Sequence, residues 1–277
     1  MACADVSSGN VVGYQGIQLP AGSKDMVSGT FIKVGGETEV ALSQLKVTGY
    51  ENSDTYLYAY MGFAASFQIR NSNGSPKNTY VWSDEAIEQL DGSFVWAGGK
   101  WMDSDSGEVI TPEKEVNFPV GTGFWFDCPD LEDCDAFYLQ SSGQVIQGSY
   151  AFELNAGGKV GACNVMPVDT TLSKVEVQGY EDSDTYLYAY MGFALTMQKL
   201  NPNGSPKNSY TWSDEALEQP DGSFIWAGGK WTDSDSGETI TTANDVDYKA
   251  GTGFWVDCPD LEDCDAFVFA FPACLVE

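Results

Sequence analysis

Apolar and polar residues alternate in short runs between glycine- and proline-containing turns, a pattern that predicts β-strands along most of the chain. Residues 11–19 and 26–34 are two such runs, divided by the turn sequence Pro20-Ala21-Gly22. Residues 56–63 alternate tyrosine with other residues, and this period of two also predicts a strand. The turns recur every 8–12 residues or so, the spacing of a β-sandwich or a partly open barrel.

Short helical turns and one irregularity are expected within this pattern. Ser83-Asp84-Glu85-Ala86 places a capping serine before two acids, which predicts a short helix. Residues 42–47 predict a single helical turn. Gly98-Gly99 interrupts a predicted strand at 94–101 and indicates a β-bulge. The sequence therefore predicts an all-β fold with short helical turns.

The strand pattern occurs twice, because the chain contains an internal duplication. Residues 49–137 align with residues 179–267 without a gap, and 66 of the 89 positions are identical. We therefore expect two tandem β-sandwich-like modules, or partly open barrels, at residues 1–140 and 141–277. No proline- or serine-rich linker lies between them, so we expect the last strand of one module to lead directly into the next.

The closest repeat within the duplication is a stretch of seventeen residues, GTGFWFDCPDLEDCDAF at 121–137 and GTGFWVDCPDLEDCDAF at 251–267. Its two cysteines are predicted to form a local disulfide that closes a short loop. Zinc is disfavoured because one module offers two thiols and the chain has no histidine. The predicted disulfides are Cys128–Cys134, Cys258–Cys264 and Cys163–Cys274, which leaves Cys3 for a bond to another subunit.

Disulfides are typical of oxidising compartments, so we expect an extracellular or cell-surface protein. The first residues lack a basic segment followed by an apolar one, so we expect this chain to carry no signal peptide. The sequence has no apolar run long enough to cross a membrane as a helix, and no membrane insertion is expected.

The charge of the chain excludes several functions. Thirteen lysines and arginines stand against 41 acids, for a net charge of −28, which would repel nucleic acid and anionic membranes. The absence of histidine removes the usual general base and the serine and cysteine triads. Carboxylate pairs arise by chance in so acidic a chain, so we expect no enzyme. Cations, or copies of the protein with their acids neutralised, are the partners that suit this surface.

Two acidic turns could bind calcium as a cofactor. Each has the sequence Asp-Ser-Asp-Ser-Gly-Glu, at 103–108 and 233–238, so aspartates at i and i+2 precede a glycine as in calcium loops. The alternative is a solvated turn in which an aspartate caps its own backbone. The candidate calcium ligands are Asp103, Asp105, Glu108, Asp233, Asp235 and Glu238.

Aromatic residues make up 13% of the chain. Tryptophans on a sheet surface could stack on sugar rings, and Trp101 and Trp231 are the candidates for a surface glycan. The alternative is that the aromatic residues form the cores of the modules or a subunit interface.

The C-terminal segment 266–275 is the most apolar stretch of the chain and has no module after it. An exposed apolar strand favours association, and the first strand of a second copy could pair with it. Such a head-to-tail contact does not close, so it builds a filament. The predicted contact residues are Cys3, Val11, Val12, Phe267, Phe269 and Phe271.

Three sequences resemble those of uncharacterised secreted bacterial proteins built of tandem β modules. They are Val11-Val12-Gly13-Tyr14-Gln15, Ser142-Gly143-Gln144-Val145 and Gly121-Thr122-Gly123-Phe124-Trp125. The resemblance covers both modules and implies an exported, surface-associated protein without catalytic residues. Together with the apolar C-terminus, it favours an extracellular structural protein, the subunit of a self-assembling filament or surface layer. The alternative function is a secreted carbohydrate-binding adhesin.

Overall fold

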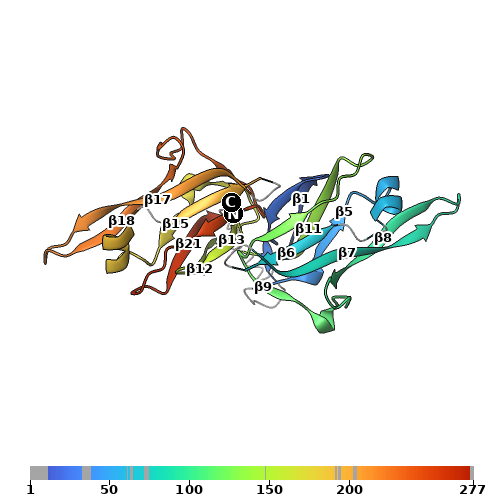
Figure 1. Ribbon diagram of the computed structural model, residues 1–277, viewed down its shortest axis with the longest axis horizontal. Helices are drawn as coiled ribbons and strands as arrows, with labels where there is room; N and C mark the ends of the chain where they lie inside the picture. The colour runs from blue at the N-terminus through green and yellow to red at the C-terminus, as the bar shows by residue number, and fades with distance from the viewer. Residues whose placement is uncertain are drawn as a thin grey trace, which may run out of the picture.

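The computed structural model describes residues 12–32, 39–60, 62, 65–71, 75–146, 148–190, 192, 195–201 and 205–274 of the 277-residue chain. Antiparallel strands dominate, with short helical turns between them, which confirms the predicted all-β fold (Figure 1). No helix in these ranges is long and apolar enough to cross a membrane. The predicted contact residues Cys3 and Val11 lie outside the described residues.

The described residues of the first module form eleven strands and three short helical turns. The helical turns are Leu42–Gln44, Tyr56–Tyr60 and Pro112–Lys114. The strands are β1 (Val12–Pro20), β2 (Lys24–Val27), β3 (Phe31–Ile32), β4 (Glu39–Ala41), β5 (Leu45–Thr48), β6 (Ser66–Arg70), β7 (Pro76–Glu88), β8 (Phe94–Asp103), β9 (Asn117–Pro119), β10 (Phe124–Asp127) and β11 (Ala136–Val145).

The described residues of the second module repeat this order without counterparts of β3 and of the Pro112–Lys114 turn. Its helical turns are Leu172–Lys174 and Tyr186–Tyr190. Its strands are β12 (Gly148–Asn155), β13 (Lys159–Cys163), β14 (Thr170–Thr171), β15 (Glu176–Gln178), β16 (Thr196–Leu200), β17 (Pro206–Glu218), β18 (Phe224–Asp233), β19 (Asp247–Tyr248), β20 (Gly253–Asp257) and β21 (Ala266–Cys274).

Two antiparallel sheets form each module. In the first module, the smaller sheet has β11 at its centre, with β1 on one side and β5 and β3 on the other. The larger sheet of this module has the order β2-β10-β6-β7-β8. In the second, the sheets are β12-β21-β15 and β13-β20-β16-β17-β18. Two-stranded ladders β4-β9 and β14-β19 complete them. Buried aromatic side chains such as Phe67, Trp101 and Phe126 fill the space between the sheets.

Each module is closed by pairing between its first and last strands. β1 pairs with β11 from Val12–Gln144 to Pro20–Ala136, and β12 pairs with β21 in the same way. Because β11 runs past residue 140 to Val145, residues 141–145 complete the first module and do not open the second. The boundary therefore lies between Val145 and Gly148, later than the sequence predicted.

Two predicted elements are wrong, and both errors have a local cause. Residues 56–60 form a π-helix and not a strand, because the Ser53 hydroxyl accepts the Tyr56 N–H at 2.9 Å and the Asp133 carboxylate accepts the Thr55 N–H at 3.0 Å. The Ser83-Asp84-Glu85-Ala86 sequence lies within β7, where pairing with β8 overrides its local preference for a helix. The helical turn expected at 42–47 is present as Leu42–Gln44.

The two modules meet about a pseudo-twofold axis. The Ser28 N–H donates to Gly251 O at 2.8 Å, and at the equivalent place the Cys163 N–H donates to Gly121 O at 3.0 Å. Single ladder contacts likewise join Val27 to Thr252 and Ala162 to Thr122. The Gly-Thr-Gly turn that opens each seventeen-residue stretch is therefore the contact with the other module.

Glycine is required where the two backbones approach each other most closely. The Gly123 N–H donates to Gly161 O at 2.7 Å. A Cβ built on Gly123 would lie 2.8 Å from Gly161 C, and one on Gly161 would lie 2.5 Å from Met26 Sδ. Both distances are below normal contact, so side chains at these positions would separate the modules.

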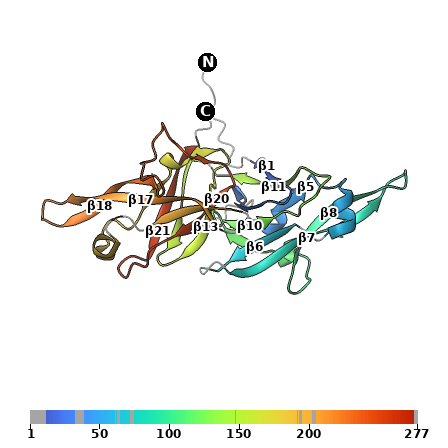
Figure 2. The ribbon, with the colours of Figure 1, turned by 45° about the horizontal axis from the view of Figure 1, so that its top comes forward.

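The pseudo-twofold axis places two long hairpins at opposite ends of an elongated molecule. In Figures 1 and 2, the β7–β8 hairpin and the β17–β18 hairpin project away from the junction in opposite directions. Each hairpin is an extension of the larger sheet of its module.

We expect Gly123→Ala to lower the free energy of unfolding by about 1–3 kcal/mol, the usual cost of overpacking. The measurement is chemical denaturation followed by tryptophan fluorescence. Gly16→Ala is the matched control, since a Cβ on Gly16 has no neighbour within 4 Å. An unchanged denaturation midpoint for Gly123→Ala would contradict the close contact between the modules.

Candidate functional site

The base of each hairpin contains a buried carboxylate bound by aromatic side chains. In the first module Tyr50 Oη donates to Asp84 Oδ2, Tyr56 Oη donates to the same oxygen at 3.2 Å, and Trp82 Nε1 donates to Tyr50 Oη. The side chain of Trp96 packs edge-on against the Tyr56 ring. We call these five residues the Asp84 network.

The second module repeats the network residue for residue around Asp214. Tyr180 Oη donates to Asp214 Oδ2 at 2.6 Å, Tyr186 Oη at 3.2 Å, and Trp212 Nε1 donates to Tyr180 Oη at 2.5 Å. In both modules the other carboxylate oxygen is buried and has no hydrogen-bond partner among the described residues. Each carboxylate is therefore held by one oxygen only.

A β-bulge turns Asp84 into the core. The register of β7 on β8 shifts between Ser83 and Glu85, which confirms the bulge predicted at Gly98-Gly99. Gly98 has a φ of +73°, a conformation that other residues seldom adopt. A Cβ on Gly99 would lie 2.2 Å from the Trp82 indole, so the bulge backbone packs directly on the network.

Burial raises the pKa of Asp84 to about 6, against the lowering effect of the two tyrosine hydrogen bonds. Asp214 is shifted to about the same pKa for the same reason. The carboxyl groups of Asp84 and Asp214 therefore bind a proton more tightly in the folded state than in the unfolded chain. Their stabilising contribution is present below about pH 4 and is lost as the pH rises through the folded-state pKa of about 6.

The outer part of each hairpin exposes apolar side chains. In the first module Ile87, Leu90 and Phe94 are exposed, and Leu90 is fully so. In the second, Leu217 and Phe224 are exposed. The Asp91 carboxylate accepts hydrogen bonds from the Ser93 N–H at 3.0 Å and the Ser93 hydroxyl at 2.6 Å, which fixes the turn between β7 and β8. We call residues 85–95 and 215–225 the hairpin tips.

The seventeen-residue stretch holds the helix beside the Asp84 network. Asp133, from the loop between the two cysteines, accepts the Ser53 hydroxyl at 2.6 Å as well as the Thr55 N–H. These hydrogen bonds lower the pKa of Asp133 to about 2. Asp263 makes the same contacts with Ser183 and Thr185. The loop thus positions the helix that carries Tyr56, a role that sequence spacing alone did not suggest.

The predicted disulfides are not formed in the structure. Cys128, Cys134, Cys163, Cys258 and Cys264 are all free thiols. Cys134 Sγ lies 3.2 Å from Gly49 O and Cys264 Sγ lies 3.0 Å from Gly179 O, so each thiol is directed at a carbonyl of the helix-side turn. Burial raises the pKa of Cys128 and of Cys258 to about 12, and the fully buried Cys163 is shifted in the same direction.

The acidic turns adopt the self-capping geometry. Asp103 Oδ1 accepts the Asp105 N–H at 3.0 Å and the Ser106 N–H at 2.8 Å, and Asp233 does the same in the second module. Glu108 is paired with Lys114 at 3.0 Å. Within the described residues no three histidine, cysteine or acidic side chains come together as a metal site. The remaining candidate ligands, Asp105, Asp235 and Glu238, are exposed on these turns.

Five of the residues predicted to meet a glycan or another subunit lie in the core. Trp101 is 2% exposed and Trp231 1%, and their indole N–H groups donate to Leu45 O and Val175 O. Neither ring has a face on which a sugar could stack. Phe267, Phe269 and Phe271 are buried, because β21 pairs with β12 along its length and with β15 at residues 268–270. Val12 pairs with Gln144.

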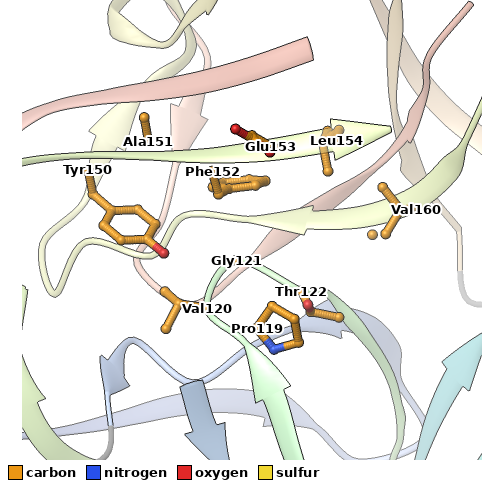
Figure 3. Close-up of a pocket in the computed structure, with 11 residues that line it drawn as sticks. Pro119, Val120, Gly121, Thr122, Tyr150, Ala151, Phe152, Glu153, Leu154 and Val160 are labelled. Atoms are coloured by element: carbon orange, nitrogen blue, oxygen red, sulfur yellow. The ribbon is translucent and has the colours of Figure 1, made fainter. Parts of the chain in front are cut away.

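An apolar groove lies at the junction between the modules (Figure 3). It has a volume of about 440 Å³ and is lined by residues 150–154 of β12, with Val120 and the turn at Gly121 opposite them. Figure 3 shows Tyr150 and Phe152 directed toward that turn and Glu153 directed away from it. A Cβ on Gly121 would lie 2.9 Å from the Phe152 ring, so the glycine allows the two modules to meet here. The pseudo-equivalent groove beside Ile17 has a volume of about 300 Å³.

No protein-family model matches this chain, and no curated protein matches it. The function of the protein must therefore be argued from its own geometry.

We expect replacement of both buried carboxylates, Asp84→Asn with Asp214→Asn, to remove part of the pH dependence of stability. In the wild type, the free energy of unfolding should fall between about pH 4 and pH 7 by up to about 3 kcal/mol for each carboxylate relative to the double variant. Chemical denaturation across this range measures the difference. Asp91→Asn with Asp221→Asn, at exposed turn positions, is the matched control. Equal pH profiles for the wild type and the buried-site variant would contradict the assignment.

We expect calcium to leave the melting temperature unchanged, because the turn backbone already occupies the Asp103 and Asp233 carboxylates. Protein treated with EDTA is compared by calorimetry before and after calcium is added, with magnesium at the same ionic strength as control. A rise in melting temperature that is specific to calcium and absent in Asp105→Asn with Asp235→Asn would instead establish the calcium site.

Proposed function

We propose that the protein is an extracellular structural protein, the subunit of a self-assembling filament or surface layer. The observation that carries the proposal is the pair of equivalent hairpins with apolar tips at opposite ends of one elongated body (Figure 1). The Leu90 and Phe94 side chains are exposed and do not pack in the core of their own module. Exposed apolar groups at both ends would allow one copy to bind two others.

The contact first expected for this assembly, pairing of a free C-terminal strand with another copy, is not retained. β21 already has a neighbour on each side, and its phenylalanines are buried within its own module. Assembly through the hairpins leaves each module closed. It also keeps the open, non-closing arrangement that a filament or layer requires.

The acidic surface supports an extracellular setting, and so does the resemblance to secreted tandem β-module proteins. The free thiols do not add to this support. A carbohydrate-binding adhesin is not proposed, because Trp101 and Trp231, its candidate stacking residues, are buried.

Self-assembly is tested on the purified full chain by sedimentation velocity and negative-stain microscopy over a range of concentration and ionic strength. We expect species larger than a dimer that grow with protein concentration and appear as filaments or sheets. A protein that sediments as a monomer under every condition would refute the structural function.

A further inference from the structure

The hairpin tips combine apolar and acidic side chains, and both copies share this composition. Residues 85–94 contain Glu85, Glu88 and Asp91 and no base, and residues 215–224 likewise contain three acids and no base. The exposed Leu90 and Phe94 lie among these carboxylates. A surface that covers a tip must therefore offer apolar contact and positive charge.

Two tips cannot supply this surface to each other. Contact between them would bring three carboxylates of one copy against three of another, and like charges across an interface oppose association. The net charge of −28 adds to this repulsion.

Two strand ends at the centre of the molecule carry basic side chains instead. The described residues of two segments, 66–71 with 75–78 and 196–201 with 205–209, contain Arg70, Lys77, Lys199 and Lys207 and no acid. These segments form the ends of β6–β7 and β16–β17 nearest the junction, where Lys199 and Lys207 are close enough to Asp25 of the other module to affect its pKa. We call these two segments, with Trp255, the waist.

The waist also offers apolar surface. Trp255 and Leu200 are partly exposed and pack against the buried cluster of Met26, Trp125 and Cys163. The Arg70 guanidinium lies 5.1 Å from the centre of the Trp125 ring. Aromatic surface with basic residues around it matches an apolar tip with carboxylates around it.

We propose that the hairpin tip of one copy docks on the waist of a second copy of the same chain. This inference rests on the proposed self-assembly and names the surface that carries it. Ile87, Leu90 and Phe94 cover Trp255 and Leu200, and the tip carboxylates meet the waist lysines. The contact joins two different surfaces, and each copy has two tips, so one copy can bind two others and the contact can propagate into a layer or a branched filament.

The apolar part of the contact is tested with Leu90→Ser, Phe94→Ser and Phe224→Ser in one chain. These side chains are exposed, so the variant folds as the wild type does, and near-UV circular dichroism checks this. We expect the concentration at which assembly begins to rise by roughly tenfold or more, the effect of about 1.4 kcal/mol. Val168→Ser with Tyr188→Ser, which removes exposed apolar side chains elsewhere, should leave this concentration unchanged.

The charge pairing is tested with two reversed chains. One carries Glu85→Lys, Glu88→Lys, Glu215→Lys and Glu218→Lys at the tips, and the other carries Lys77→Glu, Lys199→Glu and Lys207→Glu at the waist. Each alone brings like charges together and should stay monomeric. Their mixture pairs opposite charges and should assemble. Lys46→Glu with Lys114→Glu is the control for net charge.

The outcomes separate this inference from the proposed function. A wild type that never assembles overturns both. Assembly of the wild type that persists in the apolar tip variant and in each reversed chain alone overturns only the tip–waist contact. A mixture of reversed chains that fails to assemble, while each folds, also overturns the tip–waist pairing.

Discussion

The close approach of two backbones at Gly123 and Gly161 is the constraint on which the rest of the structure depends. It brings the Gly-Thr-Gly turn of one module onto the second strand of the other, and the pseudo-twofold axis repeats this contact at Gly251. Because the modules meet edge to edge at this point, their larger sheets extend in opposite directions. The hairpins at the far ends of those sheets therefore lie at the two ends of the molecule (Figure 2).

Each hairpin is in turn fixed to its module by one buried carboxylate. The bulge at Gly98-Gly99 directs Asp84 inward, and the helix bearing Tyr56 is held in place by Ser53 and Asp133. The seventeen-residue stretch thus acts at both of its ends. Its opening glycines join the modules, and its acidic loop fixes the helix beneath the hairpin. The disulfide expected between its cysteines is not seen; the loop is held instead by the hydrogen bonds that Asp133 accepts from Ser53 and Thr55.

Sequence reasoning predicted the strands, the duplication and the bulge, because these depend on local alternation and on glycine. It failed at residues 56–60, where alternating tyrosines suggested a strand, because the helix depends on Asp133, which is distant in sequence. It failed for Phe267 and for Trp101 for a related reason. An apolar run or an aromatic residue looks the same in the sequence whether it lies in a core or on a binding surface. Phe267 is buried because β21 pairs with β12 and β15, and Trp101 is buried between the sheets. The hairpin tips did carry a signal, since Leu90 stands alone among polar turn residues.

The differences between the two modules indicate why they pair with each other within one chain. Met26 and Gly161 occupy equivalent positions on β2 and β13, and the Met26 sulfur fills the space that a side chain at Gly161 would take. Two copies of the first module would place methionine against methionine there. Arg70 and Leu200 are likewise at equivalent positions. The Arg70 guanidinium lies over the Trp125 ring, whereas Leu200 packs against the cluster of Met26, Trp125 and Cys163. The packing of Met26 on Gly161 therefore favours pairing of the first module with the second over pairing of two first modules. The hairpin tips lie away from this junction, so the pairing of the two modules leaves their apolar side chains exposed.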